Sequence, residues 1–147
     1  MTIETDADEI GIIGEYDEDG YPIIVSFENE MPAAEVRERQ SWLTVVSWKY
    51  DGSSRNGMPH SDLNTKMIEL ENALLDNVVS AENCTHVYNR TGNGLKEFVF
   101  YIASQDAYLK CLNDALADHP DYPIEIKFYE DSQWEDFQKL LDMFRGK

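Results

Sequence analysis

From residue 42 onward, the sequence changes between strand-like and helix-like periodicity in an order that few folds accommodate. The segment "SWLTVVSWKYDG" is rich in β-branched and aromatic residues and predicts a strand. From Ser61 to Val78, apolar residues recur every three or four positions and predict a helix. Two strands, "CTHVYNR" and "LKEFVFYIA", a helix from near Ser104 and the alternating strand "YPIEIKFYE" follow. A capping box of Ser132 and Glu135 predicts a last helix.

This β-α-β-β-α-β order predicts an α+β fold. Two right-handed crossovers interleave into a ferredoxin-like antiparallel sheet with both helices on one face, followed by the C-terminal helix. Upstream, "EIGIIGEYDEDGYPIIVSFENE" predicts a β-hairpin, because Asp19-Gly20 is a turn signal between apolar runs. This hairpin either extends the sheet or covers its edge. We expect residues 1–9 to be an acidic disordered N-terminus and residues 10–147 to form a single domain.

The charge of the chain restricts its partners. Lys and Arg number 12 against 29 Asp and Glu, for a net charge of -17, and the acidic excess is concentrated before Arg37. Such a chain repels phosphate, so direct binding to nucleic acid or to an anionic membrane is not expected. The acidic segments are either a solvated face, a docking surface for a basic protein partner, or a mimic of nucleic acid. The N-terminus lacks signal-peptide character and no apolar run is long enough to span a bilayer, so we expect a cytoplasmic location.

A glycine-rich loop lies within "YNRTGNGLKEFVFY", residues 88–101. A phosphate-binding loop leads into a helix N-terminus, whereas this loop leads into a predicted strand. Asn93-Gly94 suits the positive φ angles of a tight turn, so the segment predicts a hairpin tip.

Arg90 and Glu97 flank that turn, where they either form a cross-strand ion pair or contribute to a polar site with a tyrosine such as Tyr88 or Tyr101. A ferredoxin-like sheet has one face free of helices, and the aromatic residues exceed what the covered face needs. We therefore expect an exposed face, or one covered by the hairpin or by a second copy of the chain in a homodimer. The candidate binding residues are Arg90, Glu97, Tyr101, Trp48 and Tyr50.

The residues that could hold a metal or act as a nucleophile are scattered. Cys84 and Cys111 have no metal-ligand spacing, and His60, His86 and His119 lie in different segments. Cys84 and His86 share a strand face but lack an oxyanion-hole motif. We therefore expect no cofactor, no metal and no catalytic residue.

Several segments together resemble the bacterial domain-of-unknown-function 695 family. They are "RTGNGLKEFVFY", the upstream helix with "MIELENALL", and "YPIEIKFYEDSQWEDF". The matching motif positions are Arg90, Thr91, Gly94, Lys96, Glu97, Phe98, Tyr101, Tyr122, Pro123, Asp131 and Trp134. The resemblance implies no reaction or cofactor. Some members of the family are joined to a domain similar to the protein regulator of ribonuclease E activity, which binds an enzyme.

These observations favour a non-catalytic module that binds or regulates another protein, through its acidic surface or the open face of its sheet. The alternative is a small-molecule-binding or hydrolase-like enzyme with a polar site around Arg90, Glu97 and Tyr101.

Overall fold

The computed structural model describes residues 3–5, 11–28, 30–53, 56–80 and 82–144. The elements are β1 (Ile3–Thr5), β2 (Gly11–Glu18), β3 (Tyr21–Glu28), α1 (Ala34–Arg39), β4 (Trp42–Lys49), α2 (Ser61–Asn77), β5 (Cys84–Gly92), β6 (Leu95–Ile102), α3 (Gln105–Ala115), β7 (Ile124–Glu130) and α4 (Glu135–Phe144). Among the described helices, none combines the length and apolar character needed to cross a membrane.

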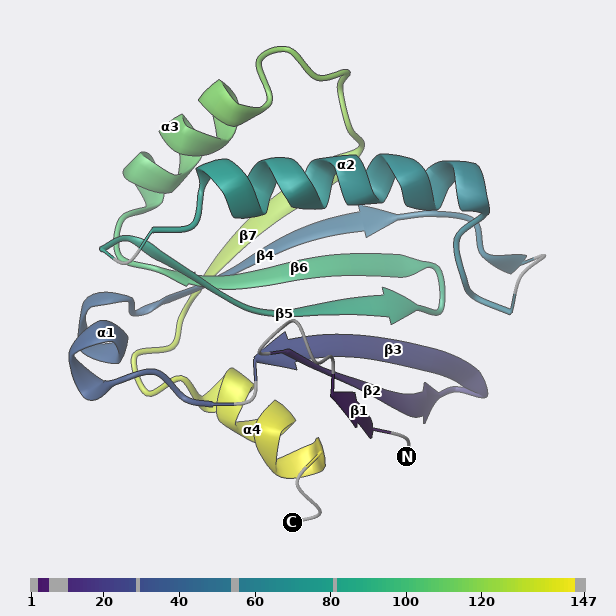
Figure 1. Cartoon of the computed structure of the whole chain (residues 1–147), viewed down its shortest axis with the longest axis horizontal. Helices are drawn as coiled ribbons and strands as arrows, with labels where there is room; N and C mark the ends of the chain where they lie inside the picture. The colour runs from purple at the N-terminus through teal and green to yellow at the C-terminus, as the bar shows by residue number, and fades with distance from the viewer. Residues whose placement is uncertain (1–2, 6–10, 29, 54–55, 81, 145–147) are drawn as a thin grey trace.

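The strands form one seven-stranded sheet in the order β1-β2-β3-β5-β6-β4-β7, and every neighbouring pair is antiparallel. The α+β class is therefore confirmed. The N-terminal hairpin extends the sheet, because β3 pairs with β5 (Figure 1). Within the segment that we expected to be disordered, Ile3–Thr5 form β1, while residues 1–2 and 6–9 lie outside the described residues.

Helices α2 and α3 cover one face of the sheet (Figure 1). The apolar face of α2 was predicted from its periodicity, and its residues Met67, Leu70 and Leu74 are buried against strands β4, β5 and β6. Trp48 and Tyr108 belong to the same core, so both helices pack over the second half of the sheet.

Helix α4 lies against the opposite face, where the sequence predicted no helix (Figure 1). Phe137, Leu141 and Phe144 of α4 and Trp134 just before it are all buried, and their spacing in the sequence predicts one apolar helix face. They pack on the hairpin and on β5 and β6. Gly14 of β2 makes this close packing possible, since a Cβ atom there would lie 2.3 Å from the Phe144 ring.

The turns and helix ends follow local chemistry, with one correction. Asn93 and Gly94 have φ angles of 50° and 77°, so the glycine-rich loop is the predicted hairpin tip. The predicted Ser132 cap is replaced by Asp131, whose carboxylate oxygens accept the backbone N–H groups of Glu135 and Asp136. This carboxylate also carries the negative charge that a helix N-terminus favours.

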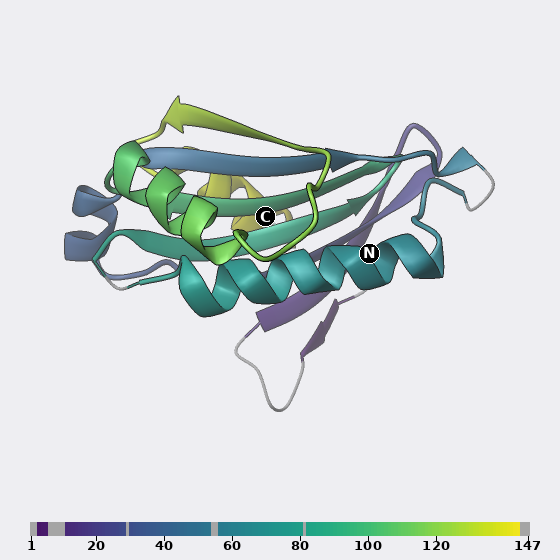
Figure 2. The ribbon, with the colours of Figure 1, turned by 90° about the horizontal axis from the view of Figure 1, so that it is seen from above.

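The helices leave part of each face uncovered. On the side of α2 and α3, the strands of the hairpin are bare beside α2, as Figure 2 shows from above. On the side of α4, the region over β4 and β7 is bare. A ligand or partner can reach the sheet at these two surfaces, one on each face.

Candidate functional site

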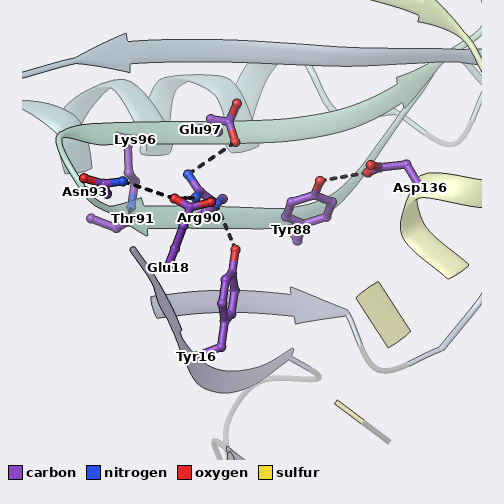
Figure 3. Close-up of polar contacts among 9 residues, drawn as sticks. All are labelled: Tyr16, Glu18, Tyr88, Arg90, Thr91, Asn93, Lys96, Glu97 and Asp136. Carbon is purple, nitrogen blue, oxygen red and sulfur yellow. Dashed lines mark hydrogen bonds and ion pairs between the residues drawn. The ribbon is translucent and has the colours of Figure 1, made fainter. Parts of the chain in front are cut away.

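Arg90 of β5 is the centre of a polar cluster that we call the Arg90 cluster and define as Tyr16, Glu18, Arg90 and Glu97 (Figure 3). Its Nη2 atom donates to Glu18 Oε2 at 2.5 Å, and its Nε atom donates to the Tyr16 hydroxyl at 3.0 Å. Glu97 lies directly opposite Arg90 across the β5–β6 ladder, yet its Oε1 atom is 3.9 Å from Arg90 Nη1. The predicted cross-strand pair is present, but the tighter partner comes from the hairpin.

The two carboxyl groups of the cluster differ electrostatically. The hydrogen bond from Arg90 lowers the pKa of Glu18. Burial raises the pKa of Glu97, and the Arg90 charge offsets only part of that effect. Burial of Arg90 lowers its own pKa, but its contacts with Tyr16 and Glu18 outweigh burial and raise the pKa above the ordinary value. Glu97 is therefore the carboxyl group of the cluster that binds a proton more readily.

A shallow hollow of about 440 Å³ lies beside the cluster, over β4, β6 and β7. It contains Glu97 and Tyr88, and Tyr88 donates a hydrogen bond to Asp136 of α4 at 2.8 Å (Figure 3). Lys49 and Lys127 also line it, so its charges are mixed.

The other predicted binding residues do not join Arg90 and Glu97. Tyr101 shares their face of the sheet but is fully buried under α4, and its hydroxyl donates to Asp131 at 2.6 Å. Trp48 is buried on the opposite face. Tyr50 also packs there, and its hydroxyl donates to the Gly57 carbonyl at 2.6 Å. The sheet therefore separates the five candidates into two groups.

The larger hollow is a groove of about 680 Å³ on the face that carries α2, between α2 and the strands β3 and β5. We call it the α2–β3 groove. Its lining combines carboxylates with apolar walls and a polar floor, and includes Ser26, Glu28, Glu30, Glu71, Leu75, Val79, His86 and Asn89. Leu75 and Val79 are 37% and 38% exposed, which is high for large apolar side chains that flank a hollow.

A β-bulge in β5 builds the floor of this groove. The register with β6 shifts between His86 and Tyr88, so Val87 and Tyr88 both face α4. In a regular strand His86 and Asn89 would face opposite sides, because residues three apart alternate. After the bulge they share a face, and His86 Nε2 lies 2.7 Å from Asn89 Oδ1.

Asn89 then connects the strand to α2, since its Nδ2 atom donates to Glu71 Oε2 at 2.8 Å. The result is a hydrogen-bonded chain from Glu71 through Asn89 to His86. Burial lowers the pKa of His86 and keeps the ring neutral at pH 7, although the Glu71 and Glu28 charges act in the other direction.

The hydrogen bonds that join Glu71, Asn89 and His86 do not include a reactive thiol. Burial raises the pKa of Cys84 to about 12, so its thiol stays protonated at neutral pH although it lies in the same groove as His86. Within the described part of the chain, no three His, Cys, Asp or Glu side chains come close enough together to hold a metal ion.

In the comparison with protein families, residues 16–141 match a family described as a family of unknown function, DUF695. The chain belongs to the DUF695 family. The match includes the whole Arg90 cluster and most of α4, so the resemblance seen in the sequence is confirmed. No curated protein and no solved structure matches the chain.

Several of the DUF695 motif positions have a structural role in this chain. The rings of Tyr101 and Trp134 stack with centroids 3.9 Å apart, and Trp134 Nε1 donates to the Gln40 carbonyl at 2.8 Å. Asp131 caps α4 and accepts from Tyr101. These three motif residues attach α4 to the sheet.

Sequence reasoning missed Tyr16, Glu18, Glu71 and Asn89. Glu18 stands next to the Asp19-Gly20 turn, and its contact with Arg90 can be inferred only once β3 is known to pair with β5. Glu71 carried a usable signal, because it is a charged residue on the edge of the apolar stripe of α2.

Proposed function

We propose that the protein is a non-catalytic binding module that receives a basic, partly apolar segment of a partner protein in the α2–β3 groove. The observation that supports this function is the composition of the groove: three carboxylates, from Glu28, Glu30 and Glu71, beside exposed apolar side chains. Lysine or arginine side chains of a partner would meet the carboxylates, and its apolar side chains would cover Leu75 and Val79.

The size and the surroundings of the groove agree with this occupant. The volume of about 680 Å³ lies within the roughly 300 to 1,000 Å³ of small-molecule and cofactor sites, so the groove has room for a few side chains of the partner segment. The apolar surface continues onto Ile24 of β3 and Ile68 of α2, which are 41% and 46% exposed. Ile68 lies three residues before Glu71, so it borders the same side of the helix.

The charge of the whole chain favours the same class of partner. A net charge of -17 attracts cationic segments over long range and raises the rate at which they encounter the protein. Apolar contacts in the groove would then supply specificity that charge alone does not provide.

We infer that the second half of the chain is a ferredoxin-like unit. The strands β5-β6-β4-β7 are neighbours in that order, with α2 and α3 on one face. This order supports the inference, because β5, which follows α2, and β7, which follows α3, are the two outer strands of the unit.

A small-molecule or hydrolase-like site at Arg90, Glu97 and Tyr101 receives less support. The Arg90 guanidinium already donates to Glu18 and Tyr16, and the Tyr101 hydroxyl is buried against Asp131.

Binding of synthetic peptides, measured by calorimetry, tests the proposed function. A peptide of alternating lysine and leucine is the probe, and peptides of lysine with serine and of glutamate with leucine are the controls. We expect only the lysine–leucine peptide to bind tightly. Its affinity should fall from about 0.1 M to about 1 M salt, as the screening length shortens from about 10 Å to about 3 Å.

Matched charge variants locate the binding surface. Glu28→Gln with Glu30→Gln removes two charges at the groove, and Asp114→Asn with Asp118→Asn removes two charges at α3 and just beyond it. We expect about tenfold weaker binding for the groove variant, which corresponds to about 1.4 kcal/mol, and unchanged binding for the other. Equal losses in both variants, or equal binding of the lysine–serine peptide, would rule out the groove as the site.

A further inference from the structure

Strand β7 forms one edge of the sheet (Figure 2), and among the described residues its only strand partner is β4. It is seven residues long, and its apolar residues Ile124, Ile126 and Phe128 are half-buried on the side of α2 and α3. Tyr129, on the other face, is 48% exposed. A strand of this length with a free edge is a template on which another strand can pair.

The register of β7 on β4 shows which backbone groups are free. The Asp131 N–H donates to the Ser41 carbonyl, which makes that pair a hydrogen-bonded one. Antiparallel pairs alternate, so the backbone groups of Glu125, Lys127 and Tyr129 face β4. The backbone groups of Ile126 and Phe128, on alternate positions, therefore face outward at the free edge.

The charges of β7 are placed so that two antiparallel copies of the strand, centred on Ile126, would set opposite charges across from each other. Glu125 and Lys127 project from the same face with their charged atoms 4.0 Å apart, and their side chains are 63% and 59% exposed. If a second copy of β7 lies antiparallel with Ile126 opposite Ile126, each Glu125 lies opposite Lys127 of the second copy. Ile124 then lies opposite Phe128.

We propose that two copies of the chain pair along β7 in this register and form a homodimer with a two-fold axis between the two Ile126 residues. In the inter-chain ladder, the N–H and C=O groups of Ile126 pair with those of the second Ile126, and each Phe128 N–H donates to the Ile124 carbonyl of the other copy. The Ile124 N–H donates to the Tyr122 carbonyl of its own chain. The Glu125 and Lys127 side chains form two cross-strand ion pairs, and the half-buried apolar side chains cover one another.

Other registers lack this complementarity. Centring the pair on Lys127 still pairs the outward backbone groups of Ile126 and Phe128, but it sets two lysines opposite each other and Glu125 opposite Tyr129. Centring it on Phe128 sets Lys127 opposite Tyr129 and Ile126 opposite Glu130. The register about Ile126 is the one of these three that joins opposite charges and free backbone groups together.

Reversal of single charges tests the register. Glu125→Lys leaves two positive residues on each strand, and Lys127→Glu leaves two negative ones, so each variant sets like charges opposite each other. We expect the parent chain to be dimeric in sedimentation equilibrium, and each single variant to dimerise at least about tenfold more weakly.

Two rescue experiments separate the proposal from a general effect of charge. The double variant Glu125→Lys with Lys127→Glu restores opposite charges and should dimerise like the parent chain. An equimolar mixture of the two single variants should form a heterodimer, because each then meets the opposite charge. A monomeric parent chain at millimolar concentration, or single variants that dimerise as tightly as the parent, would overturn the proposal.

The groove variant Glu28→Gln with Glu30→Gln should leave dimerisation unchanged, since β3 and β7 are separated by β5, β6 and β4. Failure of the groove proposal and failure of the dimer proposal are therefore distinguishable.

Discussion

The hydroxyl of Tyr101 donates a 2.6 Å hydrogen bond to Asp131, the residue that caps α4. This bond connects β6, an inner strand of the sheet, to the start of the C-terminal helix. It leaves the Asp131 carboxylate bonded both to the tyrosine and to the first free N–H groups of the helix, so strand and helix stabilise the same charge.

Tyr101→Phe should lower the free energy of unfolding by about 1.5–3 kcal/mol, the usual contribution of a hydrogen bond to a charged group. Urea denaturation would measure the change. In a double-mutant cycle with Asp131→Ala, the loss from Tyr101→Phe should become much smaller. Independent, additive losses would show that the two residues do not act together.

Trp134 is buried and has a φ angle of 57°, a left-handed conformation that is uncommon for a bulky residue. Trp134→Ala should cost about 3–5 kcal/mol through lost packing. Trp134→Gly loses the same packing but adopts the positive φ without strain. We therefore expect the glycine variant to be at least as stable as the alanine variant, against the usual order. Thermal unfolding of both variants checks this expectation.

Tyr108 carries a buried hydroxyl for which the described residues offer no hydrogen-bond partner. Burying such a group costs about 1–3 kcal/mol, so Tyr108→Phe should stabilise the protein, by about 1 kcal/mol. Phe100 and Phe128 contact the ring and would be undisturbed. A lower melting temperature for Tyr108→Phe would contradict this prediction.

His86 should make stability depend on pH near neutrality. Burial lowers its pKa in the folded protein, so the unfolded chain binds more protons at the same pH. Stability is then lost as the pH falls below the unfolded value of about 6.5, with a slope of at most about 1.4 kcal/mol per pH unit.

His86→Gln should flatten that slope between about pH 5.5 and 7.5, the range around the ordinary histidine pKa of about 6.5. Urea unfolding at several pH values, for the parent chain and the variant, measures it. An unchanged slope would assign the pH dependence to other groups.

Local features of the chain were predictable. The apolar spacing of α2, the Asn93-Gly94 turn and the alternation in β7 each depend on residues close in sequence, and the structure confirms all three. The short helix α1 was missed, because its six residues carry no buried apolar stripe.

The candidate site was predicted only in part. Arg90 and Glu97 face each other because two strands joined by a tight turn have a defined register. The bulge that joins His86 to Asn89 leaves no clear signal in the sequence. The burial of Tyr101 depends on α4 crossing a face that the sequence predicted to be free of helices.

Apart from β1 and α1, the amino-acid sequence by itself determined the order of the elements, the turns and the acidic character of the chain, because these depend on local spacing and on composition. The tertiary structure decided which polar groups meet. Arg90 bonds to Glu18, which is 72 residues away, and Asn89 bonds to Glu71 across a strand and a helix. Such contacts depend on strand order and on the side from which each helix packs, and both are set by the burial of the whole apolar surface.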